Sequence, residues 1–496
     1  MLVVAIGLFL ILALFRAVSF IRYAIAVWNN PEEAYYLEAK MVHLAWRVQH
    51  QVRLYPSWRT GPHVANFFGP VYFGMVGWIG QALGSGLDGL FRIARGTTLA
   101  GDLITTALVM VVAKKRCGWF GALLAGVLSV GAGPMIGYGA MARPDTLADA
   151  LGLLGFLVAT AAGRGRLVAG GVLLLLAVLT KQTAGMYLGA ACLSLWLMGR
   201  RKPAIGLGVG VVLTLAVFVG LITLLYEPEF GPCLLGEAGA PWAWTEYRVL
   251  LGRTVLILSE MHIGLLVGVG LWAFGPRRDP RLLGLAIVLG LACLVSALKL
   301  GSDLNYFLPW RAVTSVALAE FAGLLWAARG GRLVLGLTLW LGCGHALTLS
   351  AIHTNVQMAV AIQSIERSKS PAGRLLLQQR ERLKGLARDP AVSLLTDRGV
   401  LDIEQGERTL FGDPWLFRIL AEGNRLDLTK TIQALEEERY DVLITHGRLD
   451  DPAYLRYDFR LPQPLVDAAS AHYTFQQSTG ALMIYRPNRP KSDPKP

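Results

Sequence analysis

Residues 2–33 read LVVAIGLFLILALFRAVSFIRYAIAVWNNPEE. Residues 2–27 form an apolar run that is long enough to cross a bilayer, for which a helix needs about 20 residues. The run lacks the short apolar core and small-residue cleavage site of a signal peptide, so we expect a retained signal-anchor helix. Two carboxylates, Glu32 and Glu33, follow directly behind it. Ionisable groups at membrane depth are costly and usually functional, so these acids are the first candidate site.

The composition places the whole chain in the membrane class. It is 54% hydrophobic and only 16% charged, whereas soluble domains carry about 25% charged residues. The net charge of +13 indicates topology first and attraction to anionic lipid second. Nucleic-acid binding is excluded, because the basic residues fall between apolar runs rather than along one face. The five cysteines have neither zinc-ligand spacing nor a disulfide pattern.

Short basic clusters predict which loops are cytoplasmic. They are Lys114-Lys115-Arg116, Arg164/Arg166, Arg200-Arg201-Lys202, Arg277-Arg278/Arg281 and Arg329/Arg332. With the N-terminus inside, about eleven spans place every cluster inside, namely 2–27, 97–113, 118–138, 146–162, 167–181, 185–199, 204–226, 250–274, 282–300, 311–328 and 333–352. The chain is therefore predicted to be an α-helical polytopic membrane protein, with a membrane domain over 1–352.

One apolar segment does not fit this threading. Residues 64–84 are long enough to cross, but a crossing there would invert the charge rule for every later loop. We therefore place the segment in the first outer loop, 28–96, as a membrane-embedded helix or shallow hairpin. Whether it spans or lies in the outer leaflet stays open.

The composition of the sequence changes from apolar to polar after residue 352. Residues 353–390 are polar and basic, and we expect them to form a helical connector. The pattern of residues 391–486 predicts a small α/β domain on the outer side. Residues 487–496 are expected to form a disordered tail. The expected strands are Val392–Thr396, Tyr440–Thr445, Tyr473–Gln477 and Ala481–Tyr485, with helices at Pro414–Glu422 and Leu428–Glu438.

The threading gathers three kinds of side chain on the outer face. The acids are Glu32, Glu33 and Asp145, the cations are Arg143, Lys181, Lys299 and Arg311, and the polar or aromatic groups are Tyr36, Tyr72, Gln182, Asp303, Asn305 and Tyr306. An apolar groove with cations at its rim suits a polyprenyl tail with a phosphate head. A nearby acid suits removal of a proton from an incoming hydroxyl or amine.

Each candidate also has a structural interpretation. Glu32, Glu33 and Asp145 are acids at helix N-termini, where the helix dipole favours them. Arg143 is two residues from Asp145 and is a natural ion-pair partner for it. Lys181 and Lys299 stand at span ends, where lysines extend their ammonium groups toward water.

Six stretches carry a family resemblance. They are Pro31–Tyr36, Arg53–Pro56, Phe68–Tyr72, Ala142–Asp145, Leu179–Thr183 and Lys299–Leu308. In this order, and on one predicted face, they resemble the GT-C superfamily of integral-membrane glycosyltransferases, which includes the protein O-mannosyltransferases and the aminoarabinose transferases. The resemblance covers roughly residues 1–350.

The resemblance implies a role for particular residues. The catalytic base is an acid in the first outer loop, here Glu33 or, as the close alternative, Glu32. A second acid in the next outer loop corresponds to Asp145. Some relatives bear a metal-binding DxD there, but this chain has Arg143-Pro144-Asp145, so we assign no metal ligand and leave a divalent cation open.

The resemblance also implies a polyprenyl-phosphate sugar donor, held by the predicted cations, and an acceptor that is a lipid, a glycan or a protein. We therefore expect a glycosyltransferase that acts on the extracytoplasmic face, in a bacterial inner membrane. Two alternatives remain: a transporter or flippase of lipid-linked substrates, and an inactive GT-C-like binding protein. A transporter is expected to show repeat symmetry, which this sequence lacks.

Overall fold

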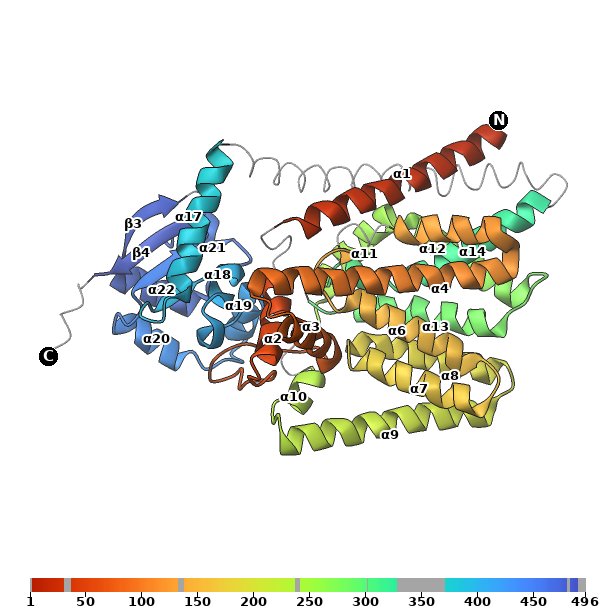
Figure 1. Cartoon of the computed structure of the whole chain (residues 1–496), viewed down its shortest axis with the longest axis horizontal. Coiled ribbons are helices and arrows are strands. Elements are labelled where there is room, and N and C mark those ends of the chain that lie inside the picture. The colour runs from red at the N-terminus through yellow and green to blue at the C-terminus, as the bar shows by residue number, and fades with distance from the viewer. Residues whose placement is uncertain are drawn as a thin grey trace.

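The structure is a computed structural model that describes residues 2–30, 37–132, 138–236, 241–300, 302–327, 371–479 and 482–488. It is mostly helical, with one small sheet near the C-terminus. The elongated helical bundle contains α1 (Leu2–Trp28), α4 (Leu87–Val130), α6 (Asp145–Thr160), α7 (Arg164–Val178), α8 (Gly185–Leu197), α9 (Arg201–Leu225), α11 (Trp244–Ile257), α12 (Ser259–Phe274), α13 (Pro280–Ser296) and α14 (Trp310–Ala327). Figure 1 shows the C-terminal part at one end of this bundle.

Shorter elements lie near the junction of the two parts. They are the helices α2 (Glu38–Gln49), α3 (Pro70–Ala82) and α10 (Phe230–Leu234) and the 3-10 turns η1 (Gln182–Ala184) and η2 (Leu304–Phe307). With 13 residues, α3 is shorter than the roughly 20 residues that a membrane crossing requires. It begins at Pro70, where the missing N–H of proline costs no helical hydrogen bond.

The long helix α4 is a hairpin of two packed arms. The chain turns at Cys117-Gly118, where Gly118 has a φ of +72°, a left-handed value that suits a residue without a Cβ. The arms lie against each other, since Thr106 Oγ1 is 3.2 Å from Ser129 Oγ. They correspond to the predicted segments 97–113 and 118–138, of which residues 133–137 lie outside the described residues.

The predicted count of about eleven spans is not confirmed. Among the described residues, two helices are long and apolar enough to cross a membrane, Leu87–Val130 and Arg201–Leu225, while Met261–Phe274 and Pro280–Ser296 are apolar but shorter. The prediction of one continuous helix over 250–274 is wrong, because Leu258 leaves the helical conformation and separates α11 from α12. The predicted span 333–352 lies outside the described residues.

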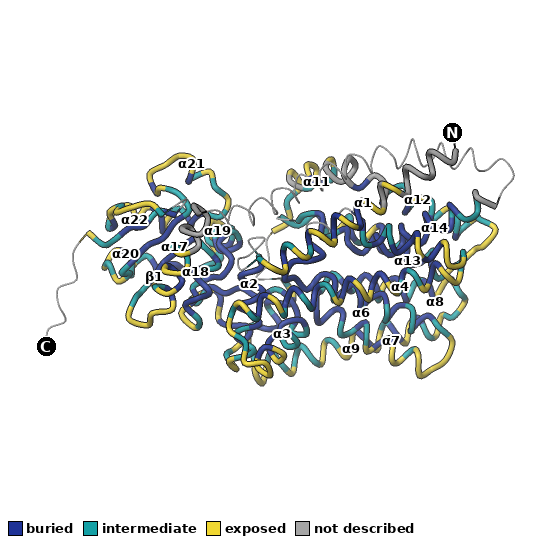
Figure 2. Tube along the Cα trace, turned by 45° about the horizontal axis from the view of Figure 1, so that its top comes forward, coloured by how far each residue is buried: buried dark blue, intermediate teal, exposed yellow. Residues whose placement is uncertain are grey.

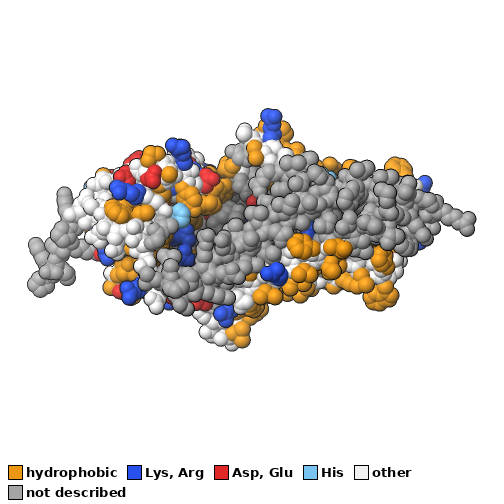
Figure 3. All heavy atoms as spheres, turned by 90° about the horizontal axis from the view of Figure 1, so that it is seen from above, with side chains coloured by type: hydrophobic (Ala, Val, Ile, Leu, Met, Phe, Trp, Pro, Cys, Tyr) orange, Lys and Arg blue, Asp and Glu red, His pale blue; other side chains and the backbone are white. Residues whose placement is uncertain are grey.

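The outer surface of the bundle is apolar. On α9, Leu213, Val217 and Leu224 are 59%, 60% and 83% exposed. A continuous apolar face of this kind is rare on soluble proteins and marks contact with lipid or protein. Figure 3 shows apolar side chains along the bundle, whereas charged side chains are frequent on the C-terminal part.

The C-terminal part is a small mixed α/β unit. It contains α17 (Pro371–Arg388), β1 (Leu394–Thr396), α18 (Gly399–Ile403), η4 (Gly406–Arg408), α19 (Pro414–Glu422), α20 (Thr429–Glu436), β2 (Val442–Thr445), α21 (Pro452–Leu455), α22 (Gln463–His472), β3 (Tyr473–Thr479) and β4 (Leu482–Pro487). The strand order is β1-β2-β4-β3, with β1 and β2 parallel and the other pairs antiparallel. The expected small mixed sheet is therefore present.

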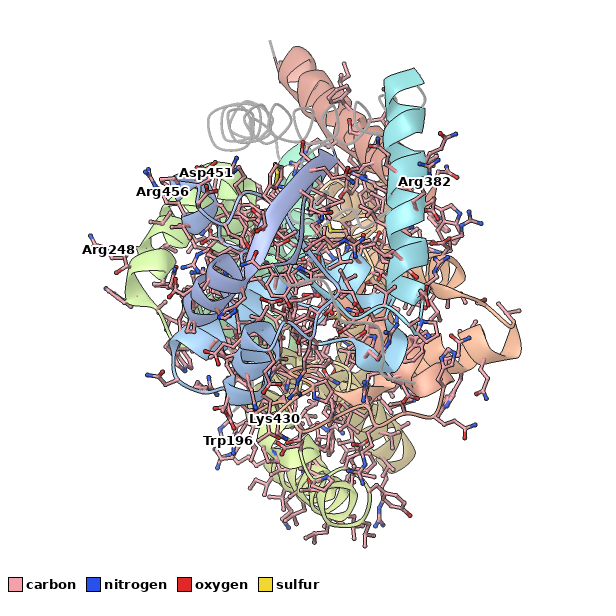
Figure 4. All side chains as sticks on the ribbon, turned by 90° about the vertical axis from the view of Figure 1, so that its left-hand side faces the viewer. Trp196, Arg248, Arg382, Lys430, Asp451 and Arg456 are labelled. Carbon is pink, nitrogen blue, oxygen red and sulfur yellow. The ribbon has the colours of Figure 1, made fainter. Side chains whose placement is uncertain are left out.

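A shared hydrophobic core joins the two parts. Ala39 and Leu44 of α2 are buried in one cluster with Ile403, Leu416 and Leu420 of the C-terminal part. Figure 2 shows buried chain running from the bundle into α2 and on to α18. Figure 4 shows Arg382 on α17 and Arg456 after α21 at opposite margins of the C-terminal part. The C-terminal part is thus packed against the end of the bundle.

Candidate functional site

A pocket with charged and aromatic walls lies at the junction between the bundle and the C-terminal part. It is partly open to solvent. Its lining comes from six separate stretches of the chain: Leu37, Phe67, Phe68, Tyr138, Arg143, Lys181, Lys299, Leu300, Asp303, Asn305, Tyr306, Asp413, Trp415 and Leu416. The structure therefore brings together six residues from our sequence analysis: Arg143, Lys181, Lys299, Asp303, Asn305 and Tyr306.

Asp145 lies beside this pocket and holds two of its cations. It is the first residue of α6 and is 3% exposed. Arg143 Nε lies 3.1 Å from Asp145 Oδ2, and Lys181 Nζ lies 2.5 Å from Asp145 Oδ1. Asn305 Nδ2 donates a third bond, at 2.9 Å. Two cations on one carboxylate favour its ionised form and leave one positive charge over.

The approach of the first loop to Lys181 depends on Gly69. A Cβ at this residue would lie 1.8 Å from the Leu179 carbonyl oxygen, so any larger residue would push the chain away. Val71 N donates to the same carbonyl at 3.2 Å. The loop before α3 is therefore held against the end of α7, two residues from Lys181.

Lys299 is the cation of the pocket that lacks a carboxylate. Its backbone is fixed beside Trp242 by an isolated β-bridge. Among the described residues no ion pair involves its ammonium group, which lies 5.3 Å from the centre of the Phe67 ring. Burial, followed by the charges of Lys181, Lys40 and Arg425, lowers the pKa of Lys299 below its ordinary value. An anion bound beside Lys299 would favour its charged form.

Aromatic and carboxylate groups complete the wall formed by the bundle. Tyr138 Oη donates to Asp303 Oδ2 at 2.6 Å, and Asp303 Oδ1 caps η2 by accepting from Leu304 N at 2.8 Å. Arg143 lies over the Tyr138 ring at 5.0 Å, and Lys181 over the Tyr306 ring at 4.9 Å. The cations are thus spaced by aromatic rings rather than by further acids.

Glu32, Glu33 and Tyr36 lie outside the described residues, but both flanks of their segment are fixed by Arg95. The Arg95 guanidinium donates to Asn30 O at 2.6 Å and forms an ion pair with Glu38 at 2.9 Å. Glu38 Oε1 in turn accepts from Ala142 N at 2.7 Å. Because Ala142 precedes Arg143, this network ties the ends of segment 31–36 to the chain that carries the pocket cations.

The structure places three other predicted residues outside the pocket lining. Arg311 is fully buried within the bundle and pairs with Asp102. Tyr72 is 0% exposed and donates to Ala94 O at 3.0 Å. Gln182 Nε2 donates to Phe67 O and to Leu234 O, the latter at 3.2 Å. All three make contacts that hold helices and loops in place.

The wall supplied by the C-terminal part contains no residue that the sequence predicts for the site. Asp413 caps α19 by accepting from Leu416 N at 3.0 Å, and it forms a buried ion pair with Lys40 Nζ at 3.3 Å. Asp-Pro at 413–414 is a recognisable helix start. Nothing local, however, indicates that its partner lies 373 residues away.

No group of three or more histidine, cysteine or acidic side chains that could hold a metal ion is found in the described part of the chain. The candidate site therefore consists of three clustered cations, one shared carboxylate and a mixed aromatic and acidic rim.

Comparison with known proteins supports the fold. No family model and no curated protein sequence matches the chain. Among solved structures, the chain is similar to ArnT from Cupriavidus metallidurans bound to undecaprenyl phosphate, with 15% identity, a TM-score of 0.56 and coverage of 95% of this chain and 97% of that chain. The apo state of ArnT gives 16% identity, a TM-score of 0.55 and coverage of 94% and 97%.

A second similar structure is the Archaeoglobus fulgidus oligosaccharyltransferase in the apo form. It has 12% identity and a TM-score of 0.52, and the match covers 98% of this chain and 74% of that chain. Both proteins belong to the GT-C superfamily, and the match extends over nearly the whole chain. The expected GT-C fold is therefore confirmed.

Proposed function

We propose that this protein is a membrane glycosyltransferase that moves a sugar from a polyprenyl-phosphate donor to an acceptor on the extracytoplasmic face. The observation that carries the proposal is the cation cluster of Arg143, Lys181 and Lys299, in which Lys299 has no carboxylate partner among the described residues. The fold adds support, because ArnT, with the same fold, has been solved bound to undecaprenyl phosphate.

The cluster suits the phosphate of such a donor. Arg143 and Lys181 share the carboxylate of Asp145, and no described carboxylate pairs with Lys299, so the pocket offers cations to an anionic head group although Asp303 and Asp413 also line it. Asp145 fixes the positions of Arg143 and Lys181 before the donor arrives, so little reorganisation is needed when charge develops on the leaving phosphate. Lys299 then supplies a charge that no carboxylate among the described residues neutralises.

The first-loop carboxylate serves as the general base. The acceptor oxygen or nitrogen attacks the anomeric carbon and gives its proton to Glu33, or to Glu32 as the alternative. The bond between that carbon and the phosphate oxygen breaks, and the electron pair leaves with the lipid phosphate. Glu33 is three residues along the chain from Asn30, which Arg95 holds.

The charge distribution supports an outward-facing pocket. Arg116, Arg200 and Arg277 belong to loops at the far end of the bundle, where Arg116 Nη2 donates to Arg277 O at 2.7 Å. Basic loops favour the cytoplasmic side. The pocket and the C-terminal part, at the opposite end of the helices, then face the extracytoplasmic side of the membrane, which we take to be a bacterial inner membrane.

A transfer assay tests the function. The purified protein in proteoliposomes is supplied with radiolabelled undecaprenyl-phosphate sugars and an envelope extract as the source of acceptors. We expect label to leave the lipid and undecaprenyl phosphate to accumulate. Label that crosses the bilayer while still attached to the lipid would identify a transporter instead, and a lipid that is neither bound nor converted would refute both functions.

A further inference from the structure

Most aromatic rings of the pocket already contact a cation or another ring. Five aromatic residues line it: Phe67, Phe68, Tyr138, Tyr306 and Trp415. Lys40 lies over the Phe67 ring at 4.4 Å, and the ring of Phe68 lies 4.4 Å from that of Phe67. Tyr138 and Tyr306 carry Arg143 and Lys181.

Trp415 is the exception. Within the described part of the chain, its indole takes part in no ring contact, cation contact or side-chain hydrogen bond. It is half-buried, on the first turn of α19, beside the fully buried Leu416. The indole packs in part against the hydrophobic cluster at the junction, and because it also lines the pocket, its remaining surface can bind a ligand.

The neighbours of Trp415 indicate which part of the ligand meets it. Asp413 and Asp303 line the same pocket, and each has one oxygen on a backbone N–H and the other on a side chain. A carboxylate offers about four acceptor positions, so Asp413 keeps capacity for hydroxyl groups. An aromatic face with carboxylates at its edge suits a sugar ring, whose C–H bonds stack on the face while its hydroxyls donate sideways.

A polyprenyl tail fits this position poorly. Trp415 belongs to the C-terminal part rather than to the apolar bundle, and the pocket between them is lined by Arg143, Lys181 and Lys299. Apolar chains avoid such surroundings because the charged groups would lose water without compensation.

We propose that Trp415 is the stacking platform for the sugar ring of the lipid-linked donor, so that the C-terminal part selects the sugar while the bundle holds the phosphate. The inference rests on the function proposed above and assigns the recognition of the donor sugar to this wall. Asp413, fixed by Lys40 from α2, positions the start of α19 and with it the indole.

The test measures separately how the sugar and the phosphate contribute to lipid binding. Binding of undecaprenyl phosphate, and of the same lipid carrying glucose, mannose or arabinose, is measured by native mass spectrometry for the wild type, Trp415→Ala and Trp415→Phe. Tyr457→Ala serves as the control, because Tyr457 is an aromatic of the same part that stacks on His446 at 4.8 Å, and it does not line the pocket.

We expect Trp415→Ala to bind the bare lipid like the wild type and to bind the preferred sugar-bearing lipid about tenfold more weakly, as for the loss of a good aromatic contact. Trp415→Phe keeps most of the affinity, and Tyr457→Ala keeps all of it. Three results would overturn the assignment: an equal loss for bare and sugar-bearing lipids, no loss for either, or a wild type that prefers no sugar-bearing lipid.

The controls distinguish this failure from failure of the proposed function. If wild-type protein does not bind the bare lipid, or binds it independently of Lys299, the glycosyltransferase proposal falls and takes this inference with it. If bare-lipid binding depends on Lys299 but Trp415→Ala treats all lipids alike, only the sugar platform is refuted.

Discussion

The two ends of the helical bundle treat buried charge in opposite ways. At the far end, the Arg116 guanidinium meets Glu320 at 2.5 Å and Asp279 at 2.8 Å, and Trp272 Nε1 donates to the same Glu320 at 3.0 Å. Arg116, Glu320 and Asp279 are therefore all paired. At the end packed against the C-terminal part, Arg143 and Lys181 share Asp145, and the described residues provide no carboxylate for Lys299.

This difference separates structure from function. A buried cation costs several kcal/mol unless a partner offsets the lost hydration, so a fold that needs only stability pairs its charges, as around Arg116. An unpaired cation in a pocket is therefore expected to bind an anionic ligand. The contrast between the ends therefore indicates where a ligand supplies the missing negative charge.

The largest expected effect concerns chemistry at the pocket end. Glu33→Gln removes the proposed base, and we expect turnover to fall by about 10²- to 10⁴-fold, the usual contribution of general base catalysis. Donor binding and melting temperature stay unchanged, because the flanks of the segment are held by Arg95. Glu32→Gln is the matched variant. If both variants keep a normal turnover number, neither glutamate is the general base.

At the paired end, the expected effect is on folding alone. Arg116→Gln leaves Glu320, 1% exposed, without its cation, and we expect a loss of about 3 kcal/mol of stability. Thermal unfolding in detergent measures this loss, and lipid binding checks the pocket. If Arg116→Gln weakens binding of undecaprenyl phosphate as much as a pocket variant does, the contrast between the ends does not hold.

The reverse pattern is expected at the pocket. Lys299→Gln removes the uncompensated cation, and we expect affinity for undecaprenyl phosphate to fall about tenfold, as for one charge-assisted hydrogen bond. Stability stays the same or rises, because a half-buried charge without a partner is lost. Arg382→Gln on α17 is the control, since it removes an equal charge from an exposed position. Equal effects from both variants would indicate non-specific attraction.

The smallest expected effect is on pH dependence. Burial and nearby cations lower the pKa of Lys299, so in the free protein its ammonium loses its proton at a lower pH than an exposed lysine does. Affinity for undecaprenyl phosphate then decreases as pH rises from 8 to 10, a range above the phosphate pKa of about 6. Lys299→Arg abolishes this decrease, because arginine stays charged. Parallel curves for the two proteins would exclude Lys299 as the titrating group.

The sequence predicts that three cations meet at one face of the membrane, but it does not predict how the helices pack around them. The charge rule places Arg143, Lys181 and Lys299 at one face although they lie on three distant stretches, and the structure brings them into one pocket. The same rule put Arg311 with them, since it stands near the start of an apolar run. Which way a residue faces is decided by neighbouring helices, and here Asp102 holds Arg311 inside the bundle.

The C-terminal wall was beyond sequence reasoning for a related reason. The helix 414–422 agrees with the structure because Asp413 and Pro414 are local signals. The ion pair between Lys40 and Asp413 depends on how α2 packs against the C-terminal part. No local sequence pattern indicates this packing. The single helix expected over 250–274 was wrong because apolar composition does not reveal a break at Leu258.

The most direct test of the account is an experimental structure of the protein with undecaprenyl phosphate. The account predicts the phosphate in the pocket, with the ammonium of Lys299 and at least one of Arg143 and Lys181 within about 3 Å of its oxygens. A phosphate bound elsewhere on the bundle, or one in the pocket that leaves Lys299 without contact, would contradict it.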